Sequence, residues 1–178
     1  MDGVFSQVLQ VGGRSNSLGR TAEVVDAVVA EPVRLRELLD CVHDQDAWVR
    51  MRAVDAVEKV CRVDPGRVAP YVEELLTTWT TSDQASVQWH LAQVLRQVRL
   101  TPAQQERAIA WLAARVVTTD ADWIVAVETM RTLLVLVDAG VVPADVVAGL
   151  VEVQRGHHSA SVRRKADQFL EQLRRTGG

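Results

Sequence analysis

The stretch DQDAWVRMRAVDAVEKV, residues 44–60, decides the fold of this chain. It opens with an aspartate-rich turn and continues with Val49 and Ala53, whose spacing places both side chains on one face of a helix. A segment repeated at a fixed period predicts an array of similar structural units. The same pair of positions returns every 37 or 38 residues, as Val87 with Leu91, Val125 with Thr129, and Val162 with Ala166.

A second apolar stripe precedes each copy of this pair. Leu35, Leu38, Leu39 and Val42 stand at positions i, i+3, i+4 and i+7, which is the pattern of an amphipathic helix. Equivalent stripes begin at Val72, Ile109 and Val147. Two stripes that keep one period predict four two-helix repeats. The expected helices lie at about 32–43, 47–62, 65–80, 85–98, 102–117, 121–138, 143–155 and 159–175.

Turn signals separate the expected units. Asp64-Pro65 and Thr101-Pro102 each place a capping side chain before a proline at the first helical position, where a missing N–H costs nothing. Gln104 completes a capping box with Thr101. No run of alternating β-branched residues predicts a strand. The sequence therefore predicts an all-α fold.

The N-terminal part departs from the repeat. An extra helix is expected at about 20–30, where it would cover the exposed end of the first unit. Residues 1–19 are expected to be an irregular lead-in, and 20–178 a single repeat domain.

Composition narrows the class of protein. The 178 residues are 48% hydrophobic and carry a net charge of −3, a balance that does not favour generic polyanion binding. No apolar run approaches the length of a membrane span, and the N-terminus lacks the basic region of a signal peptide. Cys41 and Cys61 form no C-x-x-C pair and favour reduced, partly buried thiols. A cytoplasmic protein without cofactors is expected.

On residues 44–60 and the related ASVRRKADQFLEQL, residues 160–173, the chain resembles the HEAT-like (armadillo-type) repeat family over about 32–175. The resemblance implies a right-handed α-α superhelix, or α-solenoid. It also implies a scaffolding or partner-binding role, because the family specifies an architecture more than an activity. Arg50 and Arg163 of the shared Val-Arg pairs are expected to pair with turn aspartates. The two middle units have Gln88 and Ala126 at that position.

In HEAT-like stacks the second helix of each repeat lines the concave face. Ten side chains at matching positions of these helices nominate a polar row that would receive a protein or peptide partner, and its mixed charge suits a protein better than bare phosphate backbone. The alternative is a solvated face with no ligand. The polar row comprises Arg52, Asp55, Lys59, His90, Gln93, Gln97, Glu128, Arg131, Lys165 and Gln168.

Three tryptophans, Trp48, Trp89 and Trp123, lie near the starts of successive second helices. An exposed tryptophan is a good binding anchor, because it offers a large apolar area at a small cost in entropy. Trp48 and Trp89 are the candidate anchors, although a tryptophan at helical spacing is more often packed in a core.

Other classes of site find little support. The glycine-rich segment 12–19 resembles a phosphate-binding loop but lacks the spacing, the lysine and the preceding strand of that motif. An N-terminal lead-in to the first helix is therefore favoured over an anion-binding site. The histidines and cysteines have no metal-ligand or nucleophile spacing. The main alternative is a nucleic-acid-binding protein resembling DNA alkylation-repeat glycosylases, which hold damaged DNA with Trp, Asp and Arg side chains. The candidate residues for that role are Asp122, Trp123 and Arg131. A third possibility is an accessory subunit of a larger assembly. A non-enzymatic protein-binding or scaffolding module is the leading prediction.

Overall fold

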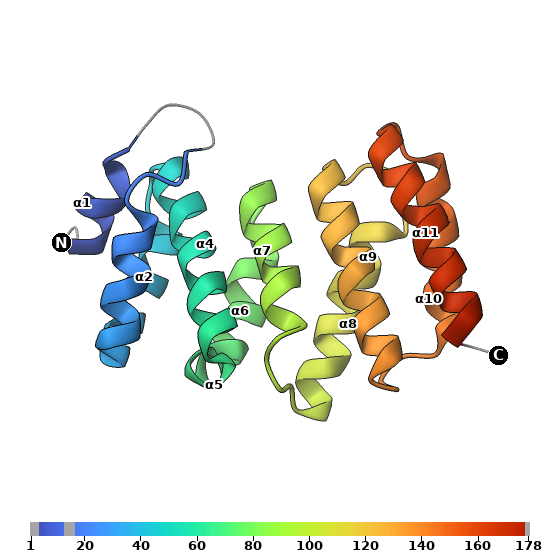
Figure 1. Cartoon of the computed structure of the whole chain (residues 1–178), viewed down its shortest axis with the longest axis horizontal. Coiled ribbons are helices and arrows are strands. Elements are labelled where there is room, and N and C mark those ends of the chain that lie inside the picture. The colour runs from blue at the N-terminus through green and yellow to red at the C-terminus, as the bar shows by residue number, and fades with distance from the viewer. Residues whose placement is uncertain (1–3, 13–16, 177–178) are drawn as a thin grey trace. The chain divides into compact units, whose positions relative to one another are not determined.

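A computed structural model describes residues 4–12 and 17–176. Helices and short 3₁₀ turns form all of its regular structure, and no strand occurs within those ranges (Figure 1). The all-α prediction is confirmed. The chain divides into two compact units, whereas the sequence suggested one repeat domain from residue 20 onward. The first comprises Met1–Val72 with Gln97–Arg99, and the second comprises Glu73–Arg96 with Leu100–Gly178.

In the first unit, α2 packs beside α4, while α1 and α3 also contact α4 (Figure 1). Its elements are α1 (Val4–Gln10), α2 (Thr21–Ala30), a 3₁₀ turn (Pro32–Arg34), α3 (Leu35–Asp40), a 3₁₀ turn (Cys41–His43), α4 (Ala47–Val63), α5 (Pro65–Val68) and a 3₁₀ turn (Ala69–Tyr71).

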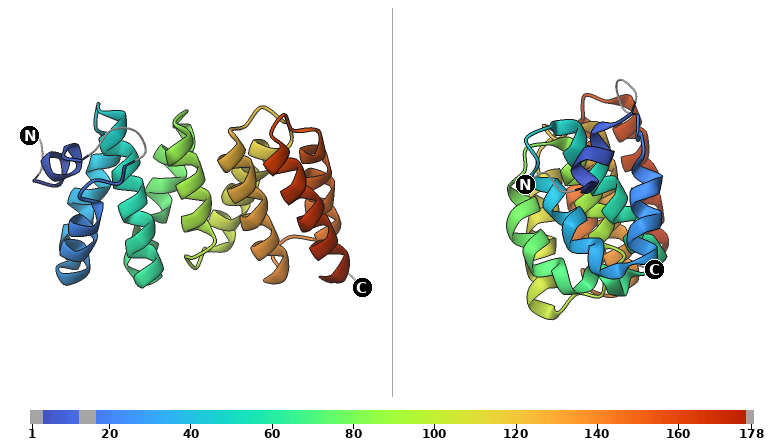
Figure 2. Two further views of the ribbon diagram at one scale, coloured as in Figure 1. Left: turned by 45° about the horizontal axis from the view of Figure 1, so that its top comes forward. Right: turned by 90° about the vertical axis from the view of Figure 1, so that its left-hand side faces the viewer.

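In the second unit, α9 lies between α7 and α11 (Figures 1 and 2). Helix α8 packs against α9, and α10 packs against α11. The elements of this unit are α6 (Val72–Thr78, the first residue of which belongs to the first unit), a 3₁₀ turn (Trp79–Thr81), α7 (Ala85–Leu95), α8 (Pro102–Val116), α9 (Trp123–Asp138), α10 (Ala144–Val153), a 3₁₀ turn (Gln154–Gly156) and α11 (Ala160–Thr176).

The second-helix positions are buried as expected. Val49 and Ala53 are fully inaccessible, as are Leu91, Val125, Thr129, Val162 and Ala166, with Val87 at 1% exposure. The apolar stripe that was expected to begin at Ile109, on the first helix of the third repeat, is displaced by about one residue. Ala108 and Leu112 are fully buried there, whereas Ile109 is half-buried.

One expected helix is interrupted, and one helix appears where none was expected. The segment 65–80 breaks around Pro70, which cannot donate a main-chain hydrogen bond and lies in a 3₁₀ turn. Residues 4–10 of the expected irregular lead-in form α1, although a helix this short is unstable in isolation. Tertiary contacts supply the stability. Phe5 and Leu9 are 3% and 0% exposed, and the Phe5 ring lies beneath the Arg34 guanidinium.

Three of the four second helices use one position to hold the turn that precedes them. Arg50, Gln88 and Arg163 reach back and donate to main-chain carbonyls five or six residues earlier. A neutral side-chain amide can also donate to a carbonyl, so these bonds explain why glutamine can replace arginine there. The bonds run from Arg50 to Asp44 (2.8 Å) and Gln45 (2.9 Å), from Gln88 to Ser82 (2.9 Å), and from Arg163 to His157 (2.8 Å) and His158 (2.9 Å).

The turn between α8 and α9 is held differently, because α9 has an alanine at this position. Gln154, which is fully buried, donates to the carbonyls of Val116 and Thr118 at 2.7 Å each. His157, also buried, forms a hydrogen bond of 2.9 Å with the carbonyl of Ala121. Side chains that follow α10 therefore stabilise the turn that precedes α9.

No helix in the described ranges is long and apolar enough to cross a membrane.

Candidate partner-binding site

Arg52, the first member of the polar row, is a structural residue. Its side chain is 2% exposed, and the guanidinium donates to the carbonyls of Leu9 (2.5 Å), Gly12 (2.6 Å) and Ser17 (3.0 Å). A buried guanidinium needs such acceptors, because an unsatisfied buried charge is very costly. Its prediction as a partner contact is therefore wrong, and Arg52 instead holds the N-terminal segment against α4.

The same N-terminal segment contains the glycines of the possible phosphate loop. Gly12 and Gly19 have φ values of 137° and 52°, and a Cβ on Gly12 would lie 2.3 Å from the Cα of Gly19. Both glycines are needed for this close approach. Residues 13–16, between them, lie outside the described part of the chain. The carbonyls of Gly12 and Ser17 point at a cation, Arg52, which is the opposite polarity from an anion cradle.

The other row positions of the first unit form ion pairs and hydrogen bonds along α4. Lys59 donates to Asp55 at 2.5 Å, and Asp55 is only 8% exposed. The neighbouring Glu58, 3% exposed, accepts from Arg62 at 2.7 Å and from Gln97 at 2.9 Å. Hydrogen bonding to Glu58 raises the pKa of Arg62 above its usual value. Here the polar row stabilises the helix face, and its carboxylates have little exposed surface to offer a partner.

In the second unit, Glu128 of α9 is the centre of another such cluster. Its carboxylate is 6% exposed and accepts from Arg131 at 2.5 Å, Arg96 at 2.7 Å and Gln93 at 3.2 Å. Two cations face one carboxylate, so the local charge of this surface is positive. Arg131 remains 42% exposed and can reach a partner, whereas Glu128 cannot.

The remaining predicted residues of α4 and α7 differ in exposure. His90 is 1% exposed, and its Nδ1 lies 2.6 Å from the carbonyl of Ser86, so it cannot contact a partner. Trp89 is half-buried and stacks on the His90 ring. Trp48 is 42% exposed and stays a candidate anchor.

A groove between α9 and α11, which lie side by side (Figure 2), contains two accessible members of the polar row. Lys165 and Gln168 line it from α11, beside Arg164 and Ser161. Across from them lies Trp123 of α9, which at 50% exposure is more accessible than Trp48. The α9–α11 groove has a volume of about 380 Å³, and Val127 is its remaining lining residue.

Trp123 and Arg164 extend the site beyond the nominated residues. Three steps of the repeat period from Arg52 arrive at Lys165 and pass over Arg164. Adjacent side chains on a helix can nevertheless border one groove when a neighbouring helix packs beside them. Trp123 follows the capping residue Asp122, whose carboxylate accepts from the amide of Ile124 at 3.0 Å. The cap fixes the start of α9 and hence the position of the tryptophan.

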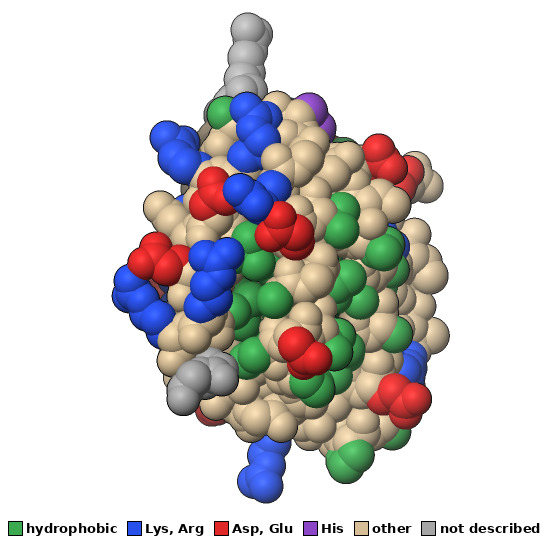
Figure 3. Space-filling model, turned by 90° about the vertical axis from the view of Figure 1, so that its right-hand side faces the viewer, with side chains coloured by type: hydrophobic (Ala, Val, Ile, Leu, Met, Phe, Trp, Pro, Cys, Tyr) green, Lys and Arg blue, Asp and Glu red, His purple; other side chains and the backbone are tan. Residues whose placement is uncertain are grey.

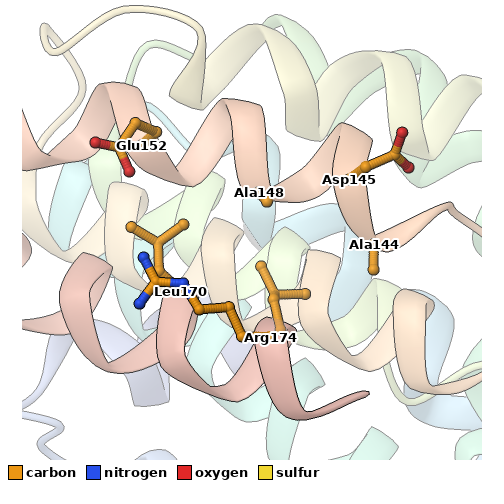
Figure 4. A pocket seen from close by; sticks show the side chains of 7 residues that line it. Ala144, Asp145, Ala148, Glu152, Leu170 and Arg174 are labelled. Atoms are coloured by element: carbon orange, nitrogen blue, oxygen red, sulfur yellow. The ribbon is translucent and has the colours of Figure 1, made fainter. Parts of the chain in front are cut away.

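A larger groove of about 560 Å³ lies between α10 and α11. On the face that these helices form, apolar side chains gather at the centre with charged ones around them (Figure 3). Asp145, Ala148 and Glu152 of α10 line the groove opposite Leu170 and Arg174 of α11 (Figure 4). Charges of both signs border this α10–α11 groove, and none of the polar row lies in it.

A third depression of about 370 Å³ has an acidic lining that includes Asp83, Asp120 and Asp122. Within 4–12 and 17–176, no group of His, Cys, Asp or Glu side chains is arranged to hold a metal ion. The two thiols are poor nucleophiles, because burial raises the pKa of Cys41 and of Cys61 to about 12, helped by nearby carboxylates such as Glu37 and Glu58.

Comparison with protein-family models, with curated proteins and with solved structures finds no match for this chain.

Proposed function

We propose that this chain is a non-enzymatic protein-binding module of HEAT-like architecture, and that the exposed face of its second helices receives a segment of a partner protein. The α9–α11 groove carries the proposal. It combines an exposed tryptophan with an arginine and a lysine in a concave site, and tryptophan and arginine are enriched in protein-binding hot spots.

The arrangement of the polar row supports binding over catalysis. Its carboxylates Asp55 and Glu128 are engaged by cations, and Glu58 beside them is engaged as well. A general acid or base must be within reach of a substrate, and these groups are covered. The exposed remainder of the row consists of cations and amides, and together with the adjacent Trp123 these groups recognise and orient a ligand without transferring protons.

Native co-purification tests the proposal with matched variants. We would compare the full chain with Trp123→Ala/Lys165→Ala, which removes one aromatic and one cation from the α9–α11 groove. Val146→Ala/Arg174→Ala is the control, because it removes one exposed apolar and one cationic side chain from α10 and α11 outside that groove. Circular dichroism would verify that both variants fold.

The expected result is a reproducible partner that is retained by the control variant and lost by the groove variant, measured by quantitative mass spectrometry. The proposal is contradicted if no protein is enriched over an unrelated bait. It is also contradicted if the groove variant retains every partner as well as the wild-type chain does.

A further inference from the structure

We propose that the α9–α11 groove binds a short acidic peptide segment that carries one large apolar side chain. This inference rests on the proposed function and names the chemistry of the partner. The apolar side chain packs against Trp123 and Val127, and the acidic residues pair with Arg164 and Lys165.

The charge of the groove favours an acidic ligand. Its lining contains two cations and no carboxylate. Arg164 has no ion-pair partner in the described part of the chain, and the Lys165 ammonium bonds to the neutral Gln168 at 3.0 Å. Both cations are therefore available to a carboxylate, and such pairs increase the rate and the specificity of association.

The acidic residues of α11 do not compete for these cations. Asp167 pairs with Arg155 at 2.9 Å, and Glu171 pairs with Arg175. On a helix with 3.6 residues per turn, Ser161, Arg164, Lys165 and Gln168 fall on one side, and Asp167 falls outside that stripe. Glu171 borders the stripe about two turns beyond Arg164, where its carboxylate is engaged by Arg175. The side of α11 that lines the groove is thus positively charged, and the carboxylates of α11 are neutralised by other arginines.

The apolar part of the ligand follows from Trp123. Trp123 is 50% exposed, while Val127, one turn along α9, is 7% exposed and lines the same groove. Covering an exposed indole with an aliphatic or aromatic side chain removes a large apolar area from water. The volume of about 380 Å³ suits one such side chain with a short length of peptide backbone.

A nucleic acid fits the same surface less well. Asp122 immediately precedes Trp123, and Asp120 lies two residues before Asp122. Both line a depression that also contains Asp83 and Arg115. A phosphate chain long enough to gain from Arg164 would also meet these carboxylates, and duplex binding requires many phosphate contacts. A peptide of a few residues can end before it reaches them.

Fluorescence anisotropy with defined probes tests the inference. The first probe is a short labelled peptide of Asp, Glu, Gly and Ser with one central Leu. In the second the Leu is replaced by Ser, and in the third the acids are replaced by their amides. A single-stranded oligonucleotide of similar length is the fourth. All are titrated against the full chain at low and at physiological salt.

Two pairs of variants localise binding. Arg164→Glu should weaken the Leu-containing acidic peptide about tenfold, while Arg174→Glu, the same reversal of an unpaired arginine on another face of α11, should change it less than about twofold. Trp123→Ala should abolish the difference between the Leu and Ser peptides. Trp48→Ala, which removes the other exposed tryptophan, should preserve that difference.

The inference is overturned if the two charge reversals act equally, if the Ser peptide binds as tightly as the Leu peptide, or if the acidic peptide does not bind. Tighter binding of the oligonucleotide would favour a nucleic-acid ligand instead. If the co-purifying partner depends on the groove while the acidic peptide fails to bind, only the peptide chemistry is wrong and the proposed function stands.

Discussion

Replacement of Arg52 by alanine tests the assignment of this residue to the fold. The guanidinium donates to three main-chain carbonyls at 2.5 to 3.0 Å, and a hydrogen bond to a charged group contributes about 1.5 to 3 kcal/mol. Water can reach the carbonyls once the segment relaxes, so the lower value applies to each bond. We therefore expect Arg52→Ala to cost about 3 to 5 kcal/mol of local stability.

The loss should concentrate in α1, because Leu9 and Gly12 are among the residues whose carbonyls lose their donor. Hydrogen–deuterium exchange followed by mass spectrometry measures this directly. Amides of residues 4–12 should exchange about a hundredfold to a few thousandfold faster in the variant, because about 1.4 kcal/mol of local opening free energy corresponds to a factor of ten. Arg52→Lys should give a smaller effect, because one compact ammonium cannot span three carbonyls.

Arg36→Ala is the matched control, since Arg36 forms an exposed ion pair with Asp40 at 2.7 Å. An exposed pair of this kind contributes at most about 1 kcal/mol. If Arg52→Ala leaves exchange in residues 4–12 unchanged, or costs no more than Arg36→Ala in urea denaturation, Arg52 does not hold the N-terminal segment.

Three further predictions concern the core. Leu112→Ala, at a fully buried position of α8, should lower the free energy of unfolding by roughly 2–5 kcal/mol in urea denaturation, and a neutral result would contradict its place in the core. Glu128→Gln should lower the free energy of unfolding by about 1 to 3 kcal/mol in the same measurement, because Arg96 and Arg131 lose their shared counter-charge. Equal stability would mean that these ion pairs do not stabilise the fold. Cys41 and Cys61, whose pKa values are raised from 9.0 to about 12, should react with a thiol reagent at pH 8 only after unfolding, and rapid labelling of the native chain would refute their burial. Because the thiols ionise first in the unfolded chain, the stability that they contribute should be full below about pH 9 and should fall as the pH rises toward 12.

The helical class could be predicted because helical periodicity is a local property of the sequence. Val49 and Ala53 repeat at a fixed spacing, and the equivalent positions are buried throughout. Helix α1 could not be predicted in this way. Its seven residues gain their order from distant partners, including the Glu37 carboxylate, which accepts from the amide of Phe5 at 2.9 Å.

The candidate site was predicted only in part, for a related reason. The repeat period identifies which helix face a side chain occupies, but not whether another segment covers it. Arg52 is covered by a segment about 40 residues earlier in the chain, which the period does not register. Lys165 and Gln168 remain accessible, and their combination with Trp123 depends on how α9 packs beside α11.

The bonds from Gln154 make the repeats unequal as building blocks. A repeat array is often treated as modular, so that a unit can be deleted from one end without loss in the others. Here truncation before α10 would leave the carbonyls of Val116 and Thr118 without their donor. A shortened variant would therefore need an arginine or glutamine in place of Ala126, at the position where the other second helices secure their own turns. Gln154, which stands at position i+7 of the stripe that begins at Val147, thus makes the α8–α9 pair dependent on the segment that follows α10.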